Sequence, residues 1–165
     1  MRQLFMLIML ITLTGFAGGT AMAQDKPTAG EARKVIDYYY HGKGQGAVLM
    51  DLQTCEGIGL EEGPQKNECL KNIDPGQIQI GQELQVWMNF LVPVDDTAEI
   101  IVAFSRKDKV RHTANVKLTG ATRFRTWKRI PTDKAGLWTL TIIQELEDRD
   151  LELGRLQYKV SEATQ

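Results

Sequence analysis

The feature that most constrains this chain is a two-residue alternation of apolar and polar side chains that begins after Gly46. Successive side chains of a β-strand point to opposite faces, so this period is typical of strands that bury one face. The alternation occurs in seven segments separated by turn residues: 47–54, 83–92, 98–105, 110–118, 122–130, 137–144 and 154–160. This spacing predicts a mainly β chain folded as an antiparallel β-sandwich of about seven strands.

A helical stripe precedes the strands. Ala32, Val35, Ile36 and Tyr39 recur at the spacing of one helix face, and Gly42 is a natural stop. We therefore expect a short helix over 28–40 that packs on the sheet, followed by a flexible glycine-rich link. The chain then divides into a signal peptide (1–23), an N-terminal helix and linker (24–46) and a β-sandwich domain (47–165).

The first 23 residues have the three parts of an export signal. Arg2 precedes an apolar run over 4–13, and Ala21-Met22-Ala23 is a small-x-small cleavage site. The run is shorter than the roughly 20 residues that cross a bilayer, so we expect cleavage after Ala23 rather than a retained anchor. The expected product is a secreted protein that is soluble in the periplasm.

The chain contains two cysteines, Cys55 and Cys69. In an exported protein an even pair indicates a disulfide, which here closes a loop rich in glycine. The redox alternative needs a closer C-x-x-C pair. A metal site needs more ligands than His41 and His112 add. We expect a structural disulfide, no metal and no cofactor.

Charge is distributed unevenly along the chain. Residues 24–105 contain 13 acids and 6 bases, residues 106–134 contain 10 bases and 2 acids, and residues 135–165 contain 6 acids and 3 bases. A basic block thus lies between acidic flanks. The full chain has a net charge of -1, which together with the expected compartment argues against nucleic acid as a partner.

The basic block predicts a candidate binding face. Alternation places four side chains on one side of a strand, and two further bases lie on the strand before it: Arg123, Arg125, Trp127 and Arg129, then Arg111 and Lys117. If those two strands pair, arginines flank an indole on an exposed sheet, an arrangement that suits a carboxylate or phosphate. The alternative is a solvated face, or one that pairs with the acidic run 145–150.

The second half of the chain resembles a known family. An R-x-R-T-W segment at 123–127, a G-x-W strand beginning at Gly136, and Leu153-Gly154-Arg155-Leu156 before a closing strand are similar to an uncharacterised bacterial envelope family with an immunoglobulin-like domain. The likeness covers roughly residues 80–160. It implies an immunoglobulin-like topology for the sandwich and implies no activity.

No catalytic set emerges from the residues. The G-x-S-x-G elbow is absent, and the acidic pairs lie in probable turns. We therefore expect a non-enzymatic periplasmic binding or assembly module that contacts a protein partner, or an anionic glycan or lipid head group, through the basic strand. The alternatives are a hydrolase of envelope polymer, which predicts a pocket lined by acids or His112, and a small-ligand carrier, which predicts a cavity between sheets.

Overall fold

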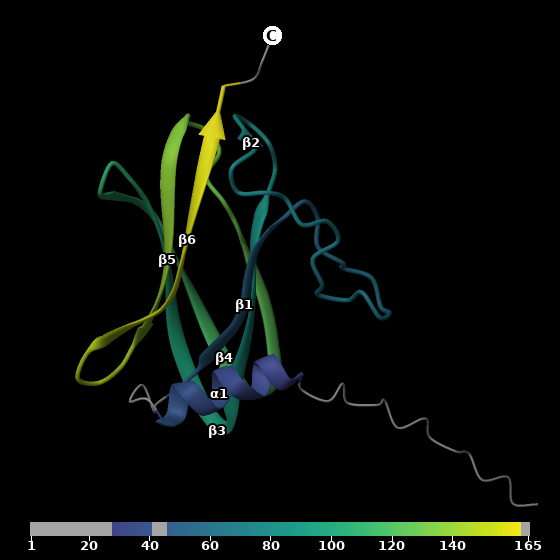
Figure 1. The fold of residues 1–165 in the computed structure, drawn as a ribbon, viewed down its shortest axis with the longest axis vertical. Coiled ribbons are helices and arrows are strands. Elements are labelled where there is room, and N and C mark those ends of the chain that lie inside the picture. The colour runs from purple at the N-terminus through teal and green to yellow at the C-terminus, as the bar shows by residue number, and fades with distance from the viewer. Residues whose placement is uncertain (1–27, 41–45, 163–165) are drawn as a thin grey trace, which may run out of the picture.

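The computed structural model describes residues 28–40 and 46–162, so the predicted signal peptide lies outside it. One helix and six strands follow in chain order (Figure 1): α1 (Ala29–Tyr40), β1 (Val48–Cys55), β2 (Ile78–Gln79), β3 (Gln85–Arg106), β4 (Lys109–Arg129), β5 (Gly136–Glu145) and β6 (Asp150–Ser161). The chain is mainly β with one short helix, as the sequence predicts.

All six strands belong to one curled sheet in the order β1-β3-β5-β6-β2, and β4 pairs with β3 beside this path. Every pairing is antiparallel except β2 with β6, which is parallel. The prediction of a purely antiparallel arrangement is therefore wrong. The parallel pair arises because the short β2 is reached through a long loop rather than a hairpin, so its direction is not set by a tight turn.

The predicted strand boundaries are wrong at two places, because four of the predicted segments form two long strands. β3 continues through Pro93, and β4 continues through Thr119 and Gly120. The register between them shifts on both sides of Val92, so both strands bend at the same place. Proline is tolerated there because a shift in register interrupts the ladder of hydrogen bonds.

The bend divides the sheet into two arms. The first arm consists of β1 with 85–92 of β3 and 121–129 of β4, and the second of 97–106 of β3 and 109–119 of β4 with β5, β6 and β2. Side chains from both arms form one core, among them Val86, Met88, Phe90, Val102, Phe104, Trp138, Leu140 and Tyr158. The space between the arms is therefore filled by the core.

The free edge of β1 approaches the part of β6 that precedes its pairing with β2. A Cβ atom on Gly154 of β6 would lie 2.5 Å from Cδ2 of Leu49 on β1, so only glycine fits without a shift. Val48 and Met50 of β1 also form a small cluster that Leu151 and Leu153 of β6 join. Among the residues that the structure describes, apolar side chains rather than backbone hydrogen bonds close this seam.

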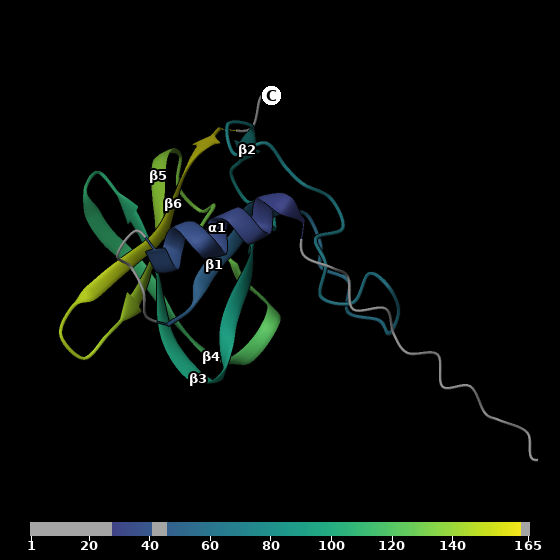
Figure 2. The same ribbon diagram turned by 60° about the horizontal axis from the view of Figure 1, so that its bottom comes forward.

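The predicted helix is present as α1, beside β1 (Figure 2). Its first turn is a capping box, in which the Thr28 hydroxyl accepts from the Glu31 N–H and the Glu31 carboxylate accepts from the Thr28 N–H. Val35 packs against the cluster on β1, whereas Ile36 is 55% exposed. The apolar contact of α1 is thus narrower than the predicted stripe.

Candidate functional site

The predicted basic residues all lie on β4. Register with β3 places Arg125 opposite Asn89, Trp127 opposite Trp87 and Arg129 opposite Gln85, so these three share the face that points away from the main core. Arg123 reaches the same side of the first arm, where α1 packs. The predicted strands 110–118 and 122–130 do not pair with each other, because they are two parts of one strand.

The arginines in the second half of β4 contact acids of the same chain. Arg123 pairs with Glu31 of α1 at 3.4 Å, Arg125 with Glu68 of the disulfide loop at 2.7 Å, and Arg129 with Glu83 at 2.9 Å. The guanidinium-bearing side chains of Arg123 and Arg125 are only 29% and 26% exposed, and that of Arg129 is 69% exposed. Arg123 and Arg125 are therefore largely covered, by acids other than the acidic run at 145–150, whereas Arg129 stays exposed.

The loop that supplies Glu68 is held in place by the predicted disulfide between Cys55 and Cys69, whose Cα atoms are 5.6 Å apart. Two isolated bridges, Cys55 with Asn72 and Ile58 with Cys69, make the loop a narrow hairpin that projects on the right of Figure 1. Within it a Cβ atom on Gly59 would lie 1.9 Å from the Gln65 carbonyl oxygen, so this close crossing requires glycine.

The same loop covers Trp87, which is 4% exposed. The indole Nε1 of Trp87 donates a 2.7 Å hydrogen bond to the Asn67 carbonyl oxygen. Beside it, Asn89 Oδ1 and Arg125 Nε are buried and have no hydrogen-bond partner among the described residues. The face under the loop therefore contains the indole of Trp87 and the polar side chains of Asn89 and Arg125. Arg125 depends on the loop for its ion pair with Glu68.

We expect Glu68→Gln to lower the free energy of unfolding by about 1–2 kcal/mol, because it leaves a half-buried guanidinium without its carboxylate. Glu83→Gln is the matched control: its pair with Arg129 is 69% and 77% exposed, so the loss should be below about 0.5 kcal/mol. Urea unfolding of both variants measures the difference. Equal losses would mean that the loop contact stabilises no more than a surface pair does.

The first half of β4 differs, since its bases are exposed. Arg111 and Lys117 are exposed, as are Lys107 and Lys109 at the turn before them. Among the described residues none of these four is in an ion pair, although Lys117 lies opposite Glu99 in the β3 register. Arg111 and Lys117 are thus open members of the predicted face. Lys107 and Lys109, which were not part of the prediction, lie beside Arg111, and these three residues are here called the basic hairpin.

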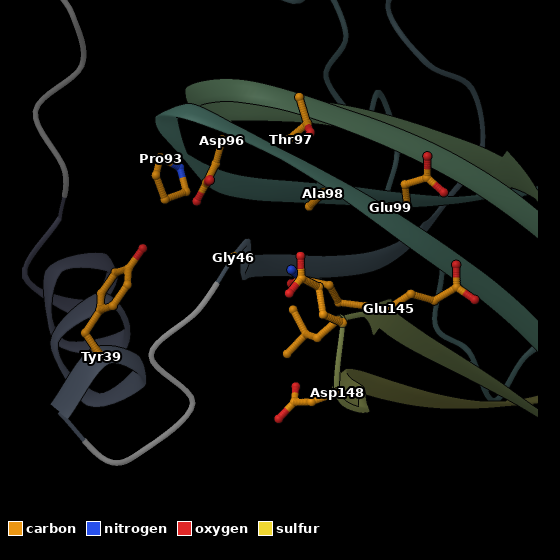
Figure 3. Close-up of a pocket in the computed structure, with 12 residues that line it drawn as sticks. Tyr39, Gly46, Pro93, Asp96, Thr97, Ala98, Glu99, Glu145 and Asp148 are labelled. Atoms are coloured by element: carbon orange, nitrogen blue, oxygen red, sulfur yellow. The ribbon is translucent and has the colours of Figure 1, made fainter.

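A groove of about 780 Å³ lies at the other end of the second arm (Figure 3). Among the described residues that line it, none is basic and five are acidic: Asp96, Glu99, Glu145, Glu147 and Asp148. Tyr39 of α1 faces it from the side, and partial burial, followed by the charge of Asp96, raises the pKa of this phenol. The sequence did not predict this groove, because segments far apart in the chain line it: α1, the middle of β3, the end of β5 and the turn after β5.

An aromatic stack closes the opposite end of the core. His112 lies 6.5 Å from Trp138, and Trp138 lies 6.1 Å from Tyr158, measured between ring centroids. The Arg106 guanidinium carbon is 5.4 Å from the centroid of Trp138. Burial raises the pKa of Tyr158, whose hydroxyl donates to the Pro131 carbonyl oxygen at 3.2 Å. These contacts account for the rings as packing, with His112 at the exposed rim.

Sequence reasoning missed the acids that cover the basic strand. One signal for Glu31 was available, because T-x-x-E at 28–31 is a capping-box pattern that places this carboxylate at the first turn of the helix. The hydrogen bond from the Thr28 N–H, with the Thr28 hydroxyl and Arg123 adding to it, lowers the pKa of Glu31. No local pattern marks Glu68 as a partner of Arg125.

Within 28–40 and 46–162, no group of three or more potential metal-binding side chains converges, and no helix is long and apolar enough to cross a membrane. No protein-family model and no curated protein matches the chain. Among solved structures, the chain is similar to the crystal structure of the C-terminal domain of wzt, with a TM-score of 0.45 and 12% identity over 72% of this chain and 75% of that chain. We draw no function from this similarity.

Proposed function

We propose that this protein is a non-enzymatic periplasmic module that binds an acidic protein surface through the basic hairpin at the start of β4. The observation that carries the proposal is the contrast along one strand. Arg123, Arg125 and Arg129 are paired with acids of the same chain, whereas Lys107, Lys109 and Arg111 are exposed and in no ion pair among the described residues.

The geometry of the hairpin supports this assignment. Its turn residues Lys107 and Asp108 have positive φ angles of 51° and 56°, the twist that suits a tight two-residue turn between antiparallel strands. Such a turn holds the backbone that carries these side chains in a defined conformation, which reduces the ordering cost of binding. Exposed charges at a binding site mainly raise the rate of association and determine which partner binds.

The proposal also includes the finer assignments of compartment and fold. The disulfide supports export to an oxidising compartment. The common core between the two arms supports an immunoglobulin-like sandwich, bent from one sheet. Among the alternatives, the filled interior does not favour a ligand carrier. The acid-lined groove matches one expectation for a hydrolase, and a substrate-turnover assay on envelope polymers separates that alternative from a binding module.

We expect Lys107→Gln/Lys109→Gln/Arg111→Gln to weaken binding of poly-L-glutamate, the model acidic partner, by about tenfold at low salt. The matched control is Lys134→Gln/Arg149→Gln/Lys159→Gln, which removes the same charge from three exposed positions elsewhere. The control should bind as the unmodified protein does. Fluorescence anisotropy at several salt concentrations measures both variants.

Two outcomes would contradict the proposal. If both triple variants lose affinity equally, net charge rather than the hairpin governs binding. If vesicles that contain anionic phospholipid bind in a hairpin-dependent manner and poly-L-glutamate does not, the partner is a lipid head group and the protein-partner assignment is wrong.

A further inference from the structure

The first half of β4 has a free edge. β4 pairs with β3 alone, and no backbone hydrogen bond links 112–118 to any other described segment. Seven consecutive register pairs, from Phe104 with His112 to Ala98 with Leu118, show that this edge is regular. It contains neither proline nor glycine, and the nearest irregularity lies just before it, between the pairs of Phe104 and Ser105. A regular, unpaired edge is a template for another strand.

A groove of about 450 Å³ lies beside this edge. One wall contains three consecutive residues of β4, His112, Thr113 and Ala114, and the other contains the segment 129–133. Consecutive strand residues point alternately to two faces, so a groove that all three line reaches the strand edge as well as the face on which Phe104 lies. The buried Phe104 and Ile130 also line it, which makes part of its surface apolar.

We propose that an extended acidic segment of the partner protein adds to this edge as a further strand, beside 112–118 of β4. This inference rests on the proposed function and specifies how the partner is held. Main-chain hydrogen bonds to the free edge would supply affinity, and alternate side chains would supply specificity. The basic hairpin lies immediately before the edge, where it would meet the acids of the segment.

The register of β4 specifies the pattern of the segment. Ala114 and Val116 lie opposite the core residues Val102 and Ile100 and so point inward, whereas Thr113, Asn115 and Lys117 are on the outer face. The side chains of an added strand alternate between the same two faces of the sheet. Its apolar residues would therefore lie near Ala114 and the groove, and its acids would lie outside, beside Lys117. We expect alternating acidic and apolar residues in the segment.

The probe for the test is a synthetic peptide, acetylated and amidated, in which glutamate and valine alternate over eight residues. Two N-methylated versions carry methyl groups on the amides of all glutamates or of all valines. A strand forms hydrogen bonds to one neighbouring strand through the backbone N–H groups of every second residue. We therefore expect one version to bind at least tenfold more weakly than the unmodified peptide and the other to bind about as well, because only one set of amides faces β4.

Hydrogen exchange supplies the second measurement. Bound peptide should slow the exchange of amides within 112–118, while the amides of β1 keep their rates. If both N-methylated versions bind equally and the basic hairpin variant still weakens binding, strand addition is wrong and the proposed function stands. If the unmodified peptide does not bind while poly-L-glutamate does so through the basic hairpin, strand addition alone is wrong. If the peptide binds equally to the basic hairpin variant, the proposed function fails as well.

Discussion

Trp138→Ala is expected to lower the free energy of unfolding by about 3–5 kcal/mol, the cost of emptying a large, fully enclosed side-chain site. Trp138 is 1% exposed and lies at the centre of the aromatic stack, between the rings of His112 and Tyr158. Its indole Nε1 also donates a 3.0 Å hydrogen bond to the Lys134 carbonyl oxygen. Alanine therefore removes packing, two ring contacts and one hydrogen bond together.

Urea unfolding measures this loss, and the adjacent residue is the matched control. Leu137 is on the same strand but points to the opposite face, where it is 58% exposed, so Leu137→Ala should cost less than about 0.5 kcal/mol. Trp138→Phe retains a ring and loses the hydrogen bond, so its loss should lie between the two. A loss below about 1 kcal/mol for Trp138→Ala would contradict the packing described for this end of the core.

The second large effect concerns the disulfide. Cys55→Ala/Cys69→Ala is expected to lower the free energy of unfolding by about 3 kcal/mol, because the crosslink closes a loop with a sequence separation of 14 and restricts the unfolded chain. The folded state is affected as well. Without the crosslink, Asn67 and Glu68 are held less firmly over Trp87 and Arg125, so the fluorescence of Trp87 should shift toward that of a solvated indole.

A reductant provides the internal control for this prediction. It should lower the stability of the unmodified protein to that of the double variant and leave the double variant unchanged. If the reductant affects both proteins equally, it acts elsewhere than on the disulfide. If the double variant is as stable as the unmodified protein, the backbone bonds and ion pairs of the loop hold it without the crosslink.

The two predictions test different parts of the fold, namely the core shared by both arms and the disulfide loop over the first arm. The aromatic stack belongs to the core that joins both arms of the sheet, so its loss should affect unfolding of the whole chain. The disulfide loop covers one face of the first arm only. Its removal should therefore expose the covered arginines before it unfolds the sheet, and hydrogen exchange would detect this as faster exchange around Trp87.

The alternation of residue types was enough to predict that the chain is mainly β and which side chains share a face of a strand. Trp138, Leu140 and Ile142 illustrate this, because strand geometry alone puts them on one side and their apolar character makes that side the core. The helix over 28–40 and the disulfide were predictable for the same reason: each depends on residue spacing or on chemistry within a short segment.

Tertiary structure alone decided where strands continue and what covers their outer face. Pro93 and Gly120 are local signals of a strand end. Pairing between β3 and β4 nevertheless continues beyond both residues, and the two strands bend at the same place. Likewise, Arg123 meets Glu31 across 92 positions of sequence, a contact that no local spacing encodes. Periodicity determines which face of a strand a side chain occupies. Whether that face meets water or another part of the chain depends on packing between distant segments.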